Sequence, residues 1–177
     1  MKSVVWKRID VPGHEHCRLG EHRIEGVAVV AYEGRPCRVE YAIDCDAEWR
    51  TRLVRVHAYV GPEEHRLTIE CEDGKWTLNG TPQPQVEGCV DVDLQFSPST
   101  NTLPIRRLAL PVGEKAEVAA AWLRFPGFTL ERLEQSYERT GERTYTYASR
   151  GGSFIASLEV GEYGLVRRYG DFWAAET

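Results

Sequence analysis

Apolar and polar residues alternate along most of this chain, as they do in β-strands that bury one face. The longest example is residues 51–60, where Val54, Val56, Ala58 and Val60 share one face. Shorter runs of the same kind occupy residues 27–31, 39–43, 144–148 and 154–159. Glycine and proline recur between these runs, and the connections are too short for helical crossovers. The pattern therefore predicts an all-β protein of many short antiparallel strands joined by turns.

Two segments have a different spacing. In residues 99–109, Ser99 or Thr100 can cap a short helix, and Pro104 would fall in its first turn, where a missing N–H does no harm. In residues 129–139, the apolar positions also have helical spacing. That second segment is short, so its pattern leaves helix and strand equally open.

Composition and charge narrow the class of protein. The chain has 177 residues, a length typical of one domain, here residues 1–177. Its net charge of -5 argues against nucleic acid as a partner and against adsorption to an anionic membrane. No apolar run is long enough for membrane insertion, and the first residues are not typical of a signal peptide. We therefore expect a cytoplasmic protein, in which five cysteines without CxxC spacing stay reduced and buried.

Residues 88–110 contain most of the candidate functional side chains. Strand spacing places Asp91 and Asp93 on one face, where two carboxylates can act as a general acid and base or bind a divalent cation. The structural alternative, which we favour, is that they pair with Arg106 and Arg107 or cap the following helix.

The two arginines point about 100° apart on a helix, so they cannot both face the core. One of them can hold an anionic head group, although a buried pair with an aspartate and one solvated arginine is the favoured arrangement. Asn101 and Thr102 can hydrogen-bond a polar head group, but residues of this kind more often cap a helix or complete a turn.

Other candidate sites are weak. The run His14-x-His16-Cys17 lacks the second pair of ligands that a zinc site needs, so we predict no metal. The sequence contains no G-x-S-x-G, H-E-x-x-H or P-loop motif, and we predict no cofactor. Most aromatic residues are expected to form the core. Trp49, beside Arg50 and Arg52, is the aromatic residue we expect at the rim of a cleft.

Several short motifs together resemble a known family. They are Trp6, Gly20-Glu21, Tyr41, Asp46, the run Trp49-Arg50-Thr51-Arg52, Asp73-Gly74-Lys75-Trp76, the whole of residues 91–108 with the string TNTLPIRRL, Gln135-Ser136-Tyr137, Gly164-Leu165-Val166 and Tyr169. The chain resembles the putative glycolipid-binding family, once defined only as a domain of unknown function, over nearly its whole length.

The resemblance implies a spiral β-roll, in which one antiparallel sheet curls around a single helix at about residues 99–109. It implies a strand at residues 129–139, a bacterial source, a homodimer and a structural kinship with periplasmic lipoprotein carriers. Those carriers are exported, whereas this sequence shows no export signal. The family's description rests on shape analogy with the carriers, so it does not by itself establish a ligand.

Three functions are compatible with these observations. The first is non-catalytic binding of an amphipathic, lipid- or glycolipid-like ligand, with Leu103, Ile105 and Leu108 at its tail and Arg106 or Arg107 with Asn101 at its head. The second is a dimeric scaffold with a filled core. The third, with the least support, is an enzyme that uses Asp91 and Asp93. An open interior favours the first, a filled one favours the second, and an unpaired carboxylate in a pocket favours the third.

Overall fold

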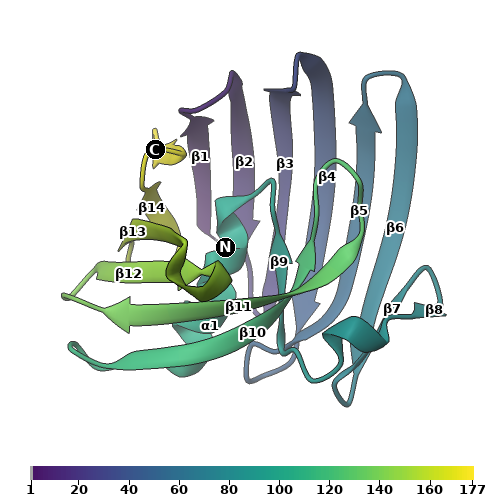
Figure 1. The fold of residues 1–177 in the computed structure, drawn as a ribbon. Coiled ribbons are helices and arrows are strands. Elements are labelled where there is room, and N and C mark those ends of the chain that lie inside the picture. Colours follow the sequence, from purple (N-terminus) through teal and green to yellow (C-terminus); the bar gives the residue numbers. More distant parts are fainter. Residues whose placement is uncertain (1) are drawn as a thin grey trace.

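The computed structural model describes residues 2–177 and arranges them as one large sheet around a short helix (Figure 1). The first eight strands are β1 (Lys2–Arg8), β2 (Gly13–Leu19), β3 (Arg23–Tyr32), β4 (Arg35–Cys45), β5 (Thr51–Val60), β6 (Glu63–Glu72), β7 (Lys75–Leu78) and β8 (Thr81–Pro82). The others are β9 (Asp91–Leu94), β10 (Lys115–Leu123), β11 (Leu130–Arg139), β12 (Thr144–Ser149), β13 (Phe154–Val160), β14 (Val166–Tyr169) and β15 (Trp173–Ala175). The predicted all-β fold class is confirmed.

The order along the sheet is β8-β7-β6-β5-β4-β3-β2-β1-β15-β14-β13-β12-β11-β10-β9. All neighbouring strands are antiparallel, as predicted, except β9 and β10, which run parallel. The segment between these two strands contains the helix, so the chain can cross over and return in the same direction. The predicted antiparallel sheet therefore has one parallel pair at its end.

The helix lies where the sequence predicts it. A 3₁₀ turn, η2 (Pro98–Asn101), leads directly into α1 (Thr102–Leu108), with Pro104 in the first turn. The side-chain cap is Ser97, at the start of η2, rather than Ser99 or Thr100, because the Ser97 hydroxyl accepts the Ser99 N–H at 3.1 Å. The N-cap of α1 itself is Asn101, which makes no side-chain cap hydrogen bond. The ambiguous segment at residues 129–139 is the strand β11, paired on both sides, so its helical spacing was misleading.

The helix separates two hydrophobic cores. In Figure 1, strands β1 to β6 stand upright, strands β10 to β12 run across them, and α1 lies between the two groups. Leu103 packs into the larger core, which is formed mainly by β1 to β7 and β10. Ile105, two residues on, packs into a smaller core of tyrosines and aliphatic side chains from β11 to β14. We call these two groups of strands the first and second limbs of the sheet. Because the helix is apolar on two sides, both limbs can bury their inner faces against it.

The sheet does not close into a barrel. The outer edge of β9 meets the start of β5, where Thr51 donates its N–H to Val90 O at 3.2 Å and its hydroxyl accepts the Val92 N–H at 3.0 Å. At the other end, β8 is two residues long and ends in Pro82, which cannot extend the hydrogen-bonding ladder. All five cysteines are free; four are buried and Cys45 is half-buried.

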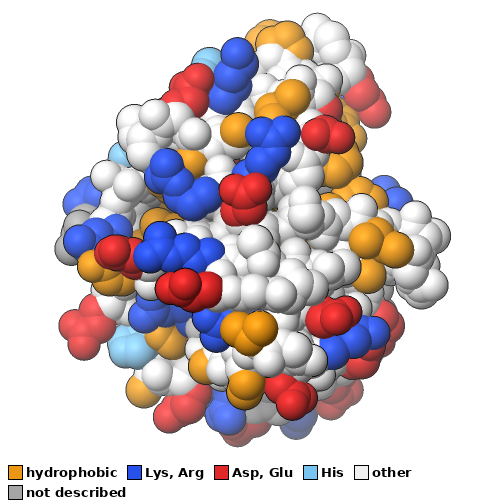
Figure 2. All heavy atoms as spheres, turned by 90° about the vertical axis from the view of Figure 1, so that its left-hand side faces the viewer, with side chains coloured by type: hydrophobic (Ala, Val, Ile, Leu, Met, Phe, Trp, Pro, Cys, Tyr) orange, Lys and Arg blue, Asp and Glu red, His pale blue; other side chains and the backbone are white. Residues whose placement is uncertain are grey.

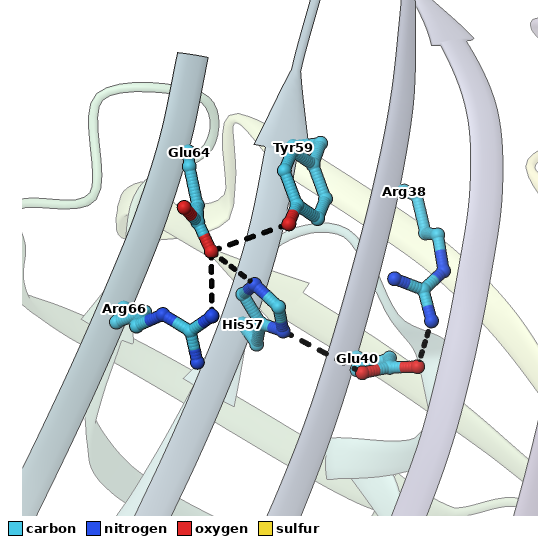
Figure 3. A network of polar contacts seen from close by, with 6 residues as sticks. All are labelled: Arg38, Glu40, His57, Tyr59, Glu64 and Arg66. Atoms are coloured by element: carbon cyan, nitrogen blue, oxygen red, sulfur yellow. Dashed lines mark hydrogen bonds and ion pairs between the residues drawn. The ribbon is translucent and has the colours of Figure 1, made fainter. Parts of the chain in front are cut away.

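The surface is mixed in charge. Figure 2, which shows the left-hand side of Figure 1, displays basic and acidic side chains interspersed with small apolar areas. On the outer face of β4, β5 and β6, His57 lies between Glu64 (Nε2–Oε1 2.8 Å) and Glu40 (Nδ1–Oε2 3.7 Å) (Figure 3). Arg66 binds the same Glu64 oxygen at 2.6 Å, and Arg38 pairs with Glu40. This outer face is therefore polar, and the apolar side chains of these strands point inward.

Gly26 is required by the packing of the first limb. It lies opposite Tyr41 in β4, and a Cβ at this position would come within 2.6 Å of the Tyr41 hydroxyl and 2.7 Å of His16 O. We expect Gly26→Ala to lower the free energy of unfolding by about 1–3 kcal/mol, as overpacking does. The control is Gly127→Ala, where a Cβ would meet nothing within 4 Å. Urea denaturation of the two variants checks this, and equal stabilities would contradict it.

Candidate ligand-binding site

The residues predicted to contact a ligand do not converge on one site. Thr102 and Leu103 are fully buried in the core, so neither can touch a ligand in this conformation. Ile105 is 7% exposed and belongs to the second core. The roles predicted for Thr102 and Leu103 are therefore wrong: these side chains hold the helix in the sheet.

Asp91 and Arg107 form a buried ion pair. The Arg107 Nη2 lies 2.5 Å from Asp91 Oδ2, and its Nε donates to Oδ1 at 3.2 Å. Burial raises the pKa of Asp91, and the hydrogen bonds from Arg107 oppose that shift. This is the structural pairing favoured from the sequence. Neither group is free to bind a ligand, because each already has its charged partner.

Arg106 and Trp49 pack against each other on another side of the helix. The Arg106 guanidinium lies 4.2 Å from the centre of the Trp49 ring, and Nη1 donates to Tyr163 O at 2.8 Å. Burial lowers the pKa of Arg106. Trp49 is 8% exposed, so the prediction that it lies on a rim is wrong. The reason is the turn before β5, where Asp46 Oδ1 accepts the N–H groups of Glu48 and Arg50 and Trp49 takes a positive φ of 64°.

Asp93 has different surroundings from Asp91, although both side chains project from the same face of β9. Its Oδ2 accepts a hydrogen bond from Gln135 Nε2 at 2.6 Å, and Gln135 also lies 3.1 Å from the Tyr147 hydroxyl. Burial raises the pKa of Asp93 to about 6. No ion pair to Asp93 is present among residues 2–177, so the carboxylate has only a neutral donor. The two aspartates therefore differ in their partners: Asp91 has a cation and Asp93 has an amide.

Asp93 borders a partly open cavity of about 280 Å³ between the two limbs of the sheet. Seven aromatic side chains line it: Tyr32, Trp122, Tyr147, Phe154, Tyr169, Phe172 and Trp173. The polar lining comes from Arg8, Asp10, Asp93, Gln95, Ser97, Asn101, Ser149 and Arg150. Of the residues predicted for the site, only Asp93 and Asn101 reach this cavity.

The aromatic wall is held by its own ring contacts. Tyr147 lies 6.0 Å from Phe154 and 5.9 Å from Tyr169, measured between ring centres, and Phe172 lies 5.6 Å from Phe154. The two contacts of Tyr147 are edge-to-face and the contact between Phe154 and Phe172 is tilted, and contacts of these kinds stabilise aromatic pairs and fix their orientation. The wall is thus preformed, with the flat faces and edges of rings available to a bound molecule.

Two arginines contribute charge to the lining. Arg8 makes a two-point contact with Asp10, at 2.8 and 3.1 Å, and its guanidinium lies 5.3 Å from the Trp173 ring. Arg150 is exposed and lies 5.2 Å from the Trp122 ring. The charge of Arg8 is therefore balanced by its neighbour, and Asp93 is the carboxylate of the lining without a cationic partner.

A second buried carboxylate lies behind the cavity. Glu15 Oε1 accepts hydrogen bonds from the Tyr41 hydroxyl at 2.5 Å and from the Ser97 hydroxyl at 2.6 Å, and Ser97 itself lines the cavity. Burial raises the pKa of Glu15 to about 8. Sequence reasoning missed this residue. The available signal was the alternation in β2, which places Glu15 on the buried face with Cys17 and Leu19.

The described residues do not assemble a metal-binding group. Among residues 2–177, no three His, Cys, Asp or Glu side chains lie close enough together to hold a metal ion. His14 and His16 lie on the exposed face of β2, and His14 Nε2 is 3.3 Å from Glu176. Within the same residues, no helix has the length and apolar character needed to cross a membrane.

The fold and the cavity define a class of protein: an open β-roll that encloses one short helix and an aromatic pocket. Residues 3–175 match the family described as "Putative glycolipid-binding", and this chain belongs to that family. A DUF1089 family protein from Pseudomonas aeruginosa has the same fold, with a TM-score of 0.83 and 32% identity over 96% of this chain and 90% of that one.

A more distant likeness concerns the fold alone. A β-barrel-like protein of the domain of unknown function DUF1849 from Brucella abortus has a TM-score of 0.54 and 11% identity, over 98% of this chain and 93% of that one. Both of these relatives of known structure come from bacteria. No curated protein matches this sequence.

Proposed function

We propose that this protein binds a small amphipathic molecule, of lipid or glycolipid type, in the aromatic cavity and performs no chemistry on it. The observation that carries the proposal is a cavity of about 280 Å³ walled by seven aromatic side chains. Ligand sites in proteins are typically concave, mainly apolar and equipped with a few polar groups. The family's description as glycolipid-binding agrees with this proposal.

The size of the cavity limits what it holds. It is at or just below the lower end of the range for drug-sized ligands, roughly 300–1,000 Å³. It therefore suits a head group or a short chain better than a complete lipid. This assigns the ligand contacts to the aromatic wall and to Asp93 and Asn101, instead of to Leu103 and the two arginines of the helix.

A direct test removes one side of the wall. Phe154→Ala should weaken the binding of octyl glucoside, used below its micellar concentration, by about tenfold, since an aromatic contact contributes up to about 1.5 kcal/mol. Ile155→Ala is the matched control, because Ile155 is on the same strand but 66% exposed on the outer face. Quenching of tryptophan fluorescence provides the measurement, as Trp122 and Trp173 line the cavity.

Native mass spectrometry of protein purified from its own host, before and after organic extraction, tests the proposal without a chosen ligand. A bound molecule that extraction removes would support it. Protein that is always free of ligand and ignores added amphiphiles would rule it out.

The scaffold hypothesis predicts a filled core, and the open cavity gives it less support. The homodimer that accompanies it stays a prediction, which light scattering in solution can test. The enzyme hypothesis keeps one of its two carboxylates, because Asp93 borders the cavity without a charged partner. It loses the other, because Asp91 is held in an ion pair with Arg107.

A further inference from the structure

We propose that the ligand carries a protonated amine, which binds against Asp93 inside the aromatic wall. This inference rests on the proposed function and narrows the ligand to a class, amine-bearing amphiphiles. The two aspartates of β9 have different partners. Asp91 is paired with Arg107 at 2.5 Å, whereas Asp93 has the Gln135 amide as its hydrogen-bond donor.

A carboxylate in such surroundings lacks what stabilises a buried charge. Burying a carboxylate is costly unless a cation compensates it, and no cationic group among residues 2–177 is paired with Asp93. The carboxylate borders the cavity, so a ligand can reach it. A ligand ammonium would therefore compensate the charge of Asp93 as the Arg107 guanidinium compensates the charge of Asp91.

The aromatic wall of the cavity also favours an ammonium group. Tyr147 and Tyr169 border the cavity together with Asp93, whereas the Trp122 ring is already occupied by the guanidinium groups of Arg124 at 4.3 Å and Arg150 at 5.2 Å. The electron-rich faces of aromatic rings attract cations, and the attraction is strongest where water is excluded. Aromatic walls around one carboxylate are a common way for proteins to recognise ammonium groups. A neutral hydroxyl would bond to Asp93 as well, but it would leave the charge uncompensated.

Four soluble probes separate the possible sources of the amine. Octyl 2-amino-2-deoxyglucoside and octyl glucoside differ by one amine on a sugar. Dihexanoyl phosphatidylethanolamine and dihexanoyl phosphatidylglycerol have the same anionic phosphate but differ in its substituent, which is an aminoethyl group in the first and an uncharged glycerol in the second. We call octyl glucoside and the phosphatidylglycerol the neutral probes, because the group that stands in place of the amine is uncharged. Titration calorimetry of the wild-type protein should show at least tenfold tighter binding of the amine in one of these pairs, and the pair that responds identifies the source.

The variant that tests the role of Asp93 is Asp93→Asn, which keeps the shape and a hydrogen-bond acceptor for Gln135. It should abolish the preference for the amine and leave the binding of the neutral probe within about threefold. Asp171→Asn removes the same formal charge at a side chain that is 98% exposed and should change neither affinity. Circular dichroism confirms that both variants fold.

The wild-type protein offers a second test that needs no variant. The pKa of Asp93 is raised to about 6 by burial, so its charge is lost below that pH and amine binding should weaken. The groups that face Asp93 are Gln135, Tyr137, Tyr147 and Tyr169, and none of them changes charge between pH 5 and 7, because burial raises the pKa of all three tyrosines. Glu15, behind the cavity, has a pKa of about 8 and largely keeps its proton up to pH 7, so the comparison is made between pH 5 and 7. Arg150 at the cavity stays charged throughout.

The outcomes distinguish the two proposals. Equal affinity for amine and neutral probes, or an amine preference that survives in Asp93→Asn, would overturn the inference and leave the binding function standing. Failure of all four probes to bind would contradict both. A preference that disappears in Asp93→Asn and below pH 6 would support both.

Discussion

Arg107→Met should lower the free energy of unfolding by about 3–5 kcal/mol, because removing one partner of a buried ion pair leaves the other charge uncompensated. Asp91 is 2% exposed and has no access to water that could replace the guanidinium. The pair also connects β9 to α1, so its loss affects the contact between sheet and helix. Urea denaturation followed by circular dichroism measures the change.

Two further variants show whether the unpaired charge is the cause. Asp91→Asn combined with Arg107→Met should recover most of the lost stability, since neither charge is then left alone. Arg106→Met, one residue earlier, removes an arginine that stacks on Trp49 and has no carboxylate partner among residues 2–177, so it should cost less. A cost below about 1 kcal/mol for Arg107→Met would contradict the structural role of the pair.

Glu15 should make the protein less stable as the pH rises from about 5 to about 8. The folded state holds the Glu15 proton up to a pKa of about 8, whereas the unfolded chain releases it near 4.5. Its contribution to stability is therefore complete below pH 4.5, falls across this window and is lost above pH 8. Each pKa unit corresponds to about 1.4 kcal/mol, so the loss between pH 5.5 and 8 is about 3 kcal/mol.

Glu15→Gln isolates this effect from the other titrating groups. The difference in unfolding free energy between wild type and variant should shift against the wild type as pH rises, because glutamine has no proton to release. Urea denaturation at half-unit pH intervals provides the comparison. A difference that is the same at every pH would mean that Glu15 is ionised in the folded state.

The fold followed from the sequence to the extent that local patterns determine it. Alternation located the strands β3, β4, β5, β12 and β13. The short apolar segment with Pro104 located the helical segment, η2 together with α1, to within one residue at each end. The resemblance, rather than periodicity, identified β11 as a strand. The parallel pairing of β9 with β10 was missed, because the direction in which β10 runs depends on the path of the chain through the helix between the two strands.

The site was predictable only in part. Spacing placed Asp91 and Asp93 on one face, but it could not show that one meets Arg107 and the other a cavity. The aromatic wall comes from six strands and the loop residue Phe172, and its strand residues alternate with outward-facing ones like any core residue. The rings that border the cavity are determined by how the two limbs of the sheet pack together. That packing cannot be read from a local sequence pattern.

The pairing of β1 with β15 has a consequence for the order of folding. Every other neighbouring pair in the sheet is also consecutive in sequence, so β1 to β8 and β9 to β15 can each form through local contacts. Joining them requires Trp6 to meet Ala175, which closes a loop of nearly the whole chain, and such closures are slow. Arg8 and Tyr32 line the cavity from the first half and Trp122 and Tyr147 from the second. The pocket is therefore complete only when the two halves are joined, and any ligand it binds will favour the joined state over states in which the halves are separate.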